Sequence, residues 1–410
     1  MSTDRPTLTG GTMVAAAMMV SNLAVYGFSV AAARLLVPAD LGAVTALLGI
    51  LLMGNVVSLG LQAATARRLS VSPEHADQII SVVLRVMLLA GCAIGLIIAV
   101  STFVLTPALK LDSHWEVVWC GAILIPLTVM GGGAGIAQGT GRWRTLSLIY
   151  VANGVGRLSG GVIALLIHPS ALSAMVGIAV GSLLPVLAAL PVMRSHGARP
   201  ATSRRPFITE TFHGTHALLA YFVLSSLDAL IARNRFDEHT SGLYAAGLIL
   251  TKAALFAPQF VSVVLFPDLA RATGRTARRR AVTAVIGIGA LAVLATFALQ
   301  PIALILVGGE QYGDVQGRLW LFALSGSVLA VVHLLVFDSL ARHSHGVTAL
   351  LWSGSAVLIA IAFVLDLDLT GLVIAVTGVA ATIAAITWFR ASSAPARPPA
   401  PRVQQPDPAP

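Results

Sequence analysis

The chain has 410 residues, of which 57% are hydrophobic and only 10% are charged. Soluble domains carry about 25% charged residues, so this composition excludes an ordinary soluble protein and indicates an integral membrane protein. The formal net charge of +9 could suggest nucleic-acid binding, but the basic residues lie in short loops between apolar runs. The positive-inside rule explains such loop charges, and we expect no nucleic acid among the partners.

Apolar runs along the chain predict about twelve transmembrane helices, since each run can cross a hydrocarbon core about 30 Å thick. A polar N-terminus at 1–11 precedes a first run of about 22 residues, which is too long for the h-region of a signal peptide. We therefore interpret this run as an uncleaved helix. The predicted spans are 12–33, 41–62, 79–105, 115–138, 146–167, 171–193, 214–232, 243–266, 281–307, 319–341, 346–365 and 371–389.

The longest interior loop follows the sixth span and predicts two lobes of six helices each in an all-α polytopic membrane protein. We expect an N-terminal lobe at 12–193, a cytoplasmic linker at 194–213 and a C-terminal lobe at 214–390. The remaining residues, 391–410, are rich in proline and lack an apolar run, which predicts a disordered cytoplasmic tail.

A weak repeat relates the two lobes. The segment ARLLVPADLG follows the first span and ARNRFDEHTSG follows the seventh, so that Arg34 matches Arg233 and Gly42 matches Gly242 after one insertion. With six spans in each lobe, such a repeat is parallel, and its axis runs along the membrane normal.

Loop charges predict the orientation in the membrane. If both termini are cytoplasmic, 18 basic residues, all arginine, fall on the cytoplasmic side. The opposite side holds five, namely Arg34, Lys110, Arg233, Arg235 and Arg318. Because cytoplasmic loops carry an excess of basic residues, the split favours a multi-pass protein with both termini in the cytoplasm.

Arg157 lies near the middle of the fifth span, where a charged side chain costs about 2.5–3.5 kcal/mol on insertion scales. Its neighbours Gly154, Gly156 and Gly160 leave space around it. One interpretation is a hydrogen bond within a helix–helix seam of small residues. The other is a guanidinium in a central cavity, where its planar fork would bind the oxygens of an anionic substrate. Both interpretations stay open.

Three further ionisable residues lie inside predicted spans. Asp228 in the seventh span and Lys252 in the eighth lie at comparable depth. They could form an ion pair between neighbouring helices, or Asp228 could bind a coupling ion, H⁺ or Na⁺. His333 in the tenth span is either a core histidine or a proton carrier. Asn55 and Gln62 are expected to form hydrogen bonds between helices.

Two arginines lie nearer to span ends and complete the candidate set for substrate binding. Arg34 can reach the membrane interface by snorkelling, and Arg85 either snorkels or lines a vestibule. The spacing of Cys92, Cys120 and the other potential ligands predicts no metal site and no cofactor. No nucleophile elbow or glycine-rich nucleotide loop is present either, so we expect no enzyme activity.

Several motifs resemble one family. They are ARLLVPADLGAVTALLGIL at the second span, GIAQGTGRWRTLSLIYVANGVGRLSGG with Gln138, Arg142 and Arg157, and LDALIARNRFDEHTSGLYAAGLILTKAALFAPQFVSVVLFPDLA with Asp228. Together they cover 12–390 and resemble the Wzx-like oligosaccharide flippases, the polysaccharide biosynthesis proteins of the multidrug/oligosaccharidyl-lipid/polysaccharide exporter superfamily. The resemblance implies a V-shaped bundle in the bacterial inner membrane. It also implies alternating access that moves a polyprenyl-pyrophosphate-linked oligosaccharide, a precursor for the cell envelope, to the outer leaflet.

Other functions stay open. A multidrug antiporter of the same superfamily would favour acidic residues in its cavity, whereas Arg157 is basic. A membrane glycosyltransferase or polymerase would need a larger outer loop with catalytic carboxylates. A non-transporting scaffold is the third alternative. Besides the lipid-linked substrate, the expected partners are membrane lipids, a coupling ion and proteins of polysaccharide assembly.

Overall fold

A computed structural model describes residues 8–194, 216–269, 275–341 and 346–393 of the chain. Its regular secondary structure is helical throughout these residues. The expected linker at 194–213 lies outside the described residues except for Arg194, and the expected tail lies outside except for 391–393. We call 8–194 the first half and 216–393 the second half.

The first half supplies six membrane crossings. In chain order its helices are α1 (Leu8–Leu35), α2 (Pro38–Gly54), α3 (Val56–Val71), η1 (Pro73–His75), α4 (Ala76–Val100), α5 (Thr102–Ala108), α6 (His114–Gly139), α7 (Trp143–Ile167), α8 (Ala171–Gly181) and α9 (Leu183–Arg194). The pairs α2–α3, α4–α5 and α8–α9 each make one predicted span that is interrupted by a break.

The second half repeats this pattern. A helical segment at 216–224 precedes α11 (Leu227–Arg235), α12 (Glu238–Leu269), α13 (Arg275–Ala298), α14 (Gln300–Leu306), η2 (Glu310–Arg318), α15 (Leu319–Ala341), α16 (Gly346–Val364) and α17 (Leu369–Ser393). Eleven helical stretches within the described part are long and apolar enough to cross a membrane. The 32-residue α12 lies where the eighth span is predicted. The all-helical polytopic fold expected from the sequence is therefore confirmed.

Five of the predicted spans are broken within their length. Breaks fall at Asn55, Ser101, Ser182 and Ser225–Ser226, and a fifth falls at Leu299, just before Pro301. Small polar side chains and prolines allow such breaks, because the backbone groups that they release can find partners in neighbouring helices or in a wet cavity. The apolar runs of the sequence predicted the spans but not their interruptions.

Glycines on α6 bring the helices of the first half together. A methyl group added at Gly133 would lie 2.6 Å from the Ala189 Cβ of α9, and one added at Gly132 would lie 2.6 Å from the Met87 Sδ of α4. On another face of α6, Gly135 lies against α3, where an added Cβ would be 2.7 Å from the Gln62 carbonyl oxygen. Close backbone approach of this kind is how membrane helices gain packing energy without a hydrophobic driving force.

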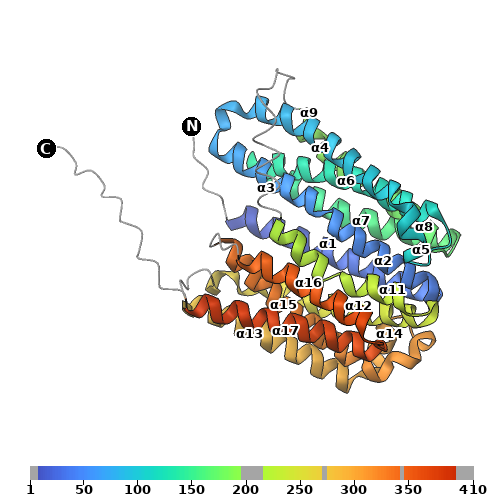
Figure 1. Ribbon diagram of the computed structural model, residues 1–410. Coiled ribbons are helices and arrows are strands. Elements are labelled where there is room, and N and C mark those ends of the chain that lie inside the picture. The colour runs from blue at the N-terminus through green and yellow to red at the C-terminus, as the bar shows by residue number, and fades with distance from the viewer. Residues whose placement is uncertain (1–7, 195–215, 270–274, 342–345, 394–410) are drawn as a thin grey trace.

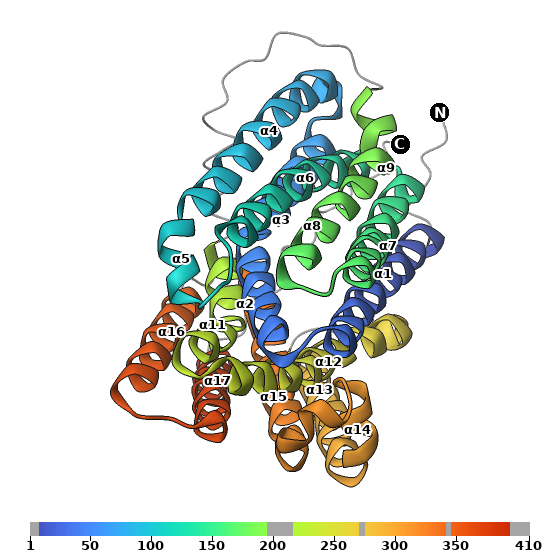
Figure 2. The ribbon, with the colours of Figure 1, turned by 90° about the vertical axis from the view of Figure 1, so that its right-hand side faces the viewer.

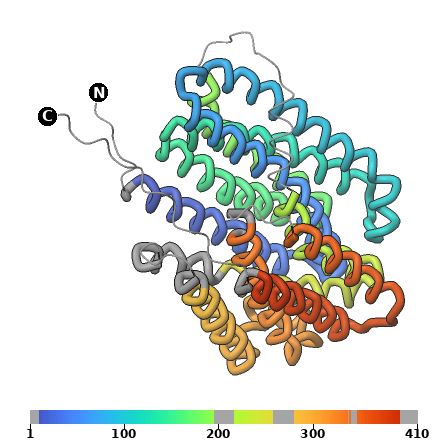
Figure 3. Tube along the Cα trace, turned by 60° about the vertical axis from the view of Figure 1, so that its left-hand side comes forward, coloured from blue at the N-terminus to red at the C-terminus, as the bar shows by residue number. Residues whose placement is uncertain are grey.

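The two halves lie side by side, with the first half in the upper part of Figure 1 and the second half in the lower part. The start of α1 and the end of α17 lie at the same end of the bundle, which we call the termini end. Figure 2 looks onto the opposite end, where α2 lies beside α11 and α12. Figure 3 shows α1 between the two halves, and α1 contacts both α7 and α12.

Backbones of the two halves touch at the end seen in Figure 2. A side chain at Gly42 would lie 3.3 Å from the Gly242 nitrogen, and one at Gly242 would collide with the Pro38 carbonyl oxygen. We call this end, formed where 33–42, 107–113, 233–242 and 305–311 meet, the closed end. The pair of glycines that the weak sequence repeat aligns therefore lies at the contact between the halves.

Candidate functional site

A cavity of about 240 Å³ lies between the halves. Residues of α1, α2, α6, α7 and α8 line it from the first half, and residues of 216–226, α11, α12 and α15 line it from the second. Among the described residues, its charged side chains are Arg157, Asp228 and Lys252. The fold therefore brings together three of the six candidates that the sequence predicted, although they are far apart along the chain.

Three of the helix breaks open onto this cavity. Asn55, Ser182 and the pair Ser225–Ser226 all contribute to its lining. At a break, backbone groups and short polar side chains become available to a ligand, and broken helices at midmembrane commonly form binding sites. The Asn55 Oδ1 is buried and has no hydrogen-bond partner, so it does not accept the interhelical hydrogen bond expected for Asn55. Gln62 does form one, with Gln138 Oε1 at 3.0 Å.

Asp228 lies in the first turn of α11, immediately after the Ser225–Ser226 break. Only 2% of the residue is exposed. Its Oδ1 accepts the Ala229 N–H at 2.8 Å, and its Oδ2 accepts the Tyr244 hydroxyl at 3.3 Å. The N-terminus of a helix favours negative charge, so the break places this carboxylate where the α11 dipole stabilises it.

Lys252 lies on α12 and is half-buried. The carboxylate of Asp228 takes its hydrogen bonds from Ala229 and Tyr244. Lys252 lies within electrostatic range of both Asp228 and Arg157. The cavity therefore places the ammonium group near charges of both signs.

Arg157 projects from α7, and its guanidinium lies over the Phe28 ring of α1 at 5.7 Å from the centroid. Its Nε is buried and makes no hydrogen bond. The glycines beside it belong to a separate seam, where Gly156 and Gly160 pack against Gly181 and Gly177 of α8. The seam and the cavity thus use different faces of α7, and the arginine belongs to the cavity face.

The other three candidates lie outside the cavity lining. Arg34 is exposed at the end of α1 and donates to the Ile305 carbonyl at 3.2 Å, so it makes a contact at the closed end. Arg85 is exposed on the apolar face of α4 that carries Leu88 and Leu96. The His333 ring packs against Tyr221 in the core of the second half, with centroids 4.9 Å apart. All three lie on helices, but on parts of those helices that do not line the cavity.

Sequence reasoning also missed residues that line or support the site. Tyr244, which is 1% exposed, holds Asp228 and packs edge-on against Phe322. The signal for the Ser225–Ser226 break was available, since adjacent serines in an apolar run are a known cause of kinks. Within the described residues, no group of three or more His, Cys, Asp or Glu side chains could hold a metal ion.

Comparison with solved structures identifies the fold. A multidrug resistance MATE family transporter of the MOP superfamily, in an inward-facing conformation, matches with a TM-score of 0.73 and 14% identity over 92% of this chain and 94% of that one. Lipid II flippase MurJ, in an inward closed conformation, matches with a TM-score of 0.73 and 11% identity over 93% and 88%. A mutant of the Vibrio cholerae MATE transporter VcmN matches with a TM-score of 0.64 and 15% identity over 94% and 97%.

The chain has the fold of MATE and MurJ transporters. No protein-family model matches the sequence, and no curated protein matches it either. The resemblance to Wzx-like flippases is thus supported at the level of the fold. A flippase and multidrug transporters share this fold, so the fold is compatible with either function.

Proposed function

We propose that the protein is a transporter that moves an anionic lipid-linked precursor across the bacterial inner membrane by alternating access. A polyprenyl-pyrophosphate-linked oligosaccharide fits this description. The single observation that carries the proposal is that Arg157 and Lys252 line one cavity from opposite halves. Two cations and one carboxylate leave the cavity with an excess of positive charge, which suits a headgroup that carries phosphates.

The two cations contribute differently to substrate binding in the proposed site. The guanidinium of Arg157 offers planar paired donors, which match phosphate oxygens, and the ammonium of Lys252 acts as a point charge. Asn55 adds an unused acceptor that could take a sugar hydroxyl. The hydrocarbon tail of the substrate would stay in the bilayer, because only the headgroup needs a path through water-accessible protein.

Asp228 is the proposed site of the coupling ion. Its carboxylate is buried at the α11 N-terminus and lines the same cavity, so H⁺ or Na⁺ bound there would change the charge that the substrate meets. The same carboxylate supports the second candidate function, a multidrug antiporter, because a cationic drug would pair with Asp228. The excess of cations disfavours that candidate.

The proposed orientation puts the termini end in the cytoplasm and the closed end outside, following the distribution of loop arginines. The cavity would then receive substrate from the cytoplasmic leaflet. Membrane lipids and proteins of polysaccharide assembly are the proposed neighbours. The protein would act as a transporter and not as an enzyme.

Purified protein in liposomes tests the proposal. Fluorescent polyprenyl-pyrophosphate sugars, placed in one leaflet, should become accessible to an impermeant quencher faster with protein than without it. A cationic drug and a neutral glycolipid, measured in the same vesicles, serve as comparison substrates. Transport of the drug together with none of the pyrophosphate lipid would favour the antiporter.

A further inference from the structure

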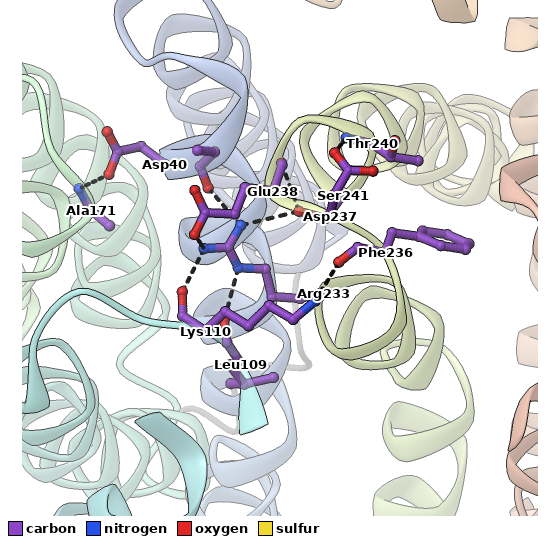
Figure 4. Close-up of polar contacts among 11 residues, drawn as sticks. Asp40, Leu109, Lys110, Ala171, Arg233, Phe236, Asp237, Glu238, Thr240 and Ser241 are labelled. Carbon is purple, nitrogen blue, oxygen red and sulfur yellow. Dashed lines mark hydrogen bonds and ion pairs between the residues drawn. The ribbon is translucent and has the colours of Figure 1, made fainter. Parts of the chain in front are cut away.

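Arg233 joins the halves at the closed end through more hydrogen bonds than its neighbours make. It lies at the end of α11, and only 3% of the residue is exposed. Its Nε donates to the Leu109 carbonyl at 2.8 Å, its Nη2 to the Lys110 carbonyl at 2.7 Å, and its Nη1 to the Ala39 carbonyl at 3.1 Å. All three acceptors belong to the first half (Figure 4).

Two of the three acceptors, the carbonyls of Leu109 and Lys110, lie at the end of α5, which cannot satisfy them by itself. Leu109 caps the C-terminus of this short helix, and Lys110 follows it with a φ of 48°, an uncommon value for a residue other than glycine. The last carbonyls of a helix lack partners within the helix and carry its partial negative charge. A guanidinium from the other half supplies both the donors and the positive charge.

Two further contacts tie the same segments together. The Lys110 Nζ donates to the Phe236 carbonyl at 2.7 Å, and the Asn234 Nδ2 donates to the Ala108 carbonyl at 2.7 Å. Figure 4 shows that Lys110 and Arg233 reach past one another in opposite directions. The end of α5 is therefore held by 233–236 as a unit, with the arginine at its buried centre.

A second set of partners for Arg233 lies on its own half. The Ser241 Oγ accepts from Nη1 at 3.1 Å, and the Glu238 Oε1 lies 4.0 Å from Nη2. The Glu238 side chain is 55% exposed. Asp237 fixes this segment, since its carboxylate accepts the Thr240 N–H at 3.0 Å, and hydrogen bonding to Thr240 holds the pKa of Asp237 below its usual value. Glu238 and Arg233 belong to the same half, so a movement of one half relative to the other would not by itself separate them.

We propose that Arg233 is the latch of the closed end and that it works by exchanging partners. In the closed state its donors hold the carbonyls of Ala39, Leu109 and Lys110 across the interface. When the closed end opens, these carbonyls move away with the first half, and the guanidinium pairs with Glu238 on its own half. The exchange spares the protein an unpaired buried charge in the open state, which would otherwise be costly.

The weak sequence repeat supplies a natural comparison. Arg34 is the counterpart of Arg233, and it also donates across the halves, to the Ile305 carbonyl in α14. This contact is single and exposed, at 3.2 Å. Arg235 supplies the opposite control, because its contacts stay within the second half, with Asp366 at 3.7 Å and over the Phe363 ring at 5.5 Å.

Spin-label distances measure the latch directly. Labels at Pro169→Cys, between α7 and α8, and Gly317→Cys, in η2, lie at exposed positions and report the separation of the halves by double electron–electron resonance in lipid nanodiscs. The background carries Cys92→Ala and Cys120→Ala, which remove the two native thiols. A label pair at Val71→Cys and Pro169→Cys, both within the first half, checks that each variant keeps its fold.

Arg233→Ala should raise the ratio of open to closed populations at least about tenfold, which corresponds to ~1.4 kcal/mol. Arg233→Lys should raise this ratio by an intermediate amount, because lysine keeps the positive charge but lacks the planar set of donors of the guanidinium. Arg34→Ala should have a smaller effect, and Arg235→Ala none. Glu238→Gln should shift the populations the other way, since it removes the partner of the open state.

Two results would overturn the proposal. If Arg233→Ala matches Arg235→Ala while the control distance is unchanged, Arg233 is no latch. If Glu238→Gln opens the closed end as Arg233→Ala does, no exchange of partners takes place. The latch rests on the proposed transport cycle for its purpose, yet these distances need no substrate. The distances could shift as described although the protein transports no pyrophosphate lipid. That outcome would contradict the proposed substrate but would still support the latch.

Discussion

Arg34 and Arg233 occupy matching positions in the two halves, and each donates hydrogen bonds to backbone carbonyls of the other half. Arg34 donates to a carbonyl within the short helix α14, and Arg233 donates to the carbonyls that directly follow the short helix α5. The receiving elements, α14 and α5, are themselves the last segments of corresponding spans. A parallel repeat thus survives in the contacts of the structure where the sequence keeps only a faint match. The two sides are unequal, because Arg233 is buried and Arg34 is exposed.

Arg157→Ala should reduce transport of the pyrophosphate lipid about tenfold to a hundredfold per folded molecule, as expected for loss of hydrogen bonds to a charged group. Arg157→Lys should give a smaller loss. The folded fraction should change little, because the glycine seam beside Arg157 is untouched. Flux in liposomes is measured together with fluorescence-detected size-exclusion profiles. Full transport per molecule in Arg157→Ala would contradict the headgroup role.

Asp228→Asn should stop coupled transport while leaving protein abundance intact, and adding Lys252→Ala should not restore it. The reason is that, in the proposed site, Asp228 binds the coupling ion and Lys252 binds the headgroup, so removing Lys252 cannot replace the lost ion site. A double-mutant cycle on transport and on thermal stability checks this expectation. If the double variant is more stable and more active than either single variant, the two charges form a structural pair.

Gly242→Ala should disturb the closed end, because the new methyl group would collide with the Pro38 carbonyl. Overpacking of this kind typically costs about 1–3 kcal/mol, and here it can be relieved by separating the halves. The spin-label pair described above would then report a longer separation. Gly287→Ala is the matched control, since nothing lies within 4 Å of an added Cβ there. Equal behaviour of the two variants would show that the glycine contact is not required for closure.

Reporter fusions test the proposed orientation. A cytoplasmic reporter should be active when fused at Thr276, beside the arginines that begin α13, and silent at Gly313 in η2. A periplasmic reporter should show the reverse pattern. Activity of the cytoplasmic reporter at Gly313 would invert the proposed direction of substrate loading.

Hydrophobic run length predicted the helical spans of the fold, because the thickness of a bilayer fixes the number of apolar residues that a crossing needs. It could not place the breaks at Asn55 and Ser182, since a single polar residue barely changes the mean hydropathy of a span. Intramembrane charge found Arg157, Asp228 and Lys252, which do share a cavity.

The same signal also selected Arg34 and Arg85, which lie outside the lining of this cavity. Depth along a helix can be counted from the sequence, but the face that meets the cavity depends on how the halves pack. Arg233 was counted only as an outer loop charge, although it is buried and makes contacts across the halves. The acceptors that explain its burial are backbone carbonyls. Every residue has a backbone carbonyl, so the sequence of side chains does not show which carbonyls need a partner.

The placement of Arg157 and Lys252 on opposite walls of one cavity has a consequence for the unloaded carrier. Drawing the halves together at the termini end would bring two like charges closer, and without an anion between them the single carboxylate of Asp228 offsets only part of their repulsion. We therefore expect idle return of the empty protein to be slow and exchange of one lipid for another to be fast. A counterflow assay would detect this difference, because unlabelled lipid on the far leaflet should accelerate the entry of labelled lipid. Lys252→Ala should make the return of the empty protein faster.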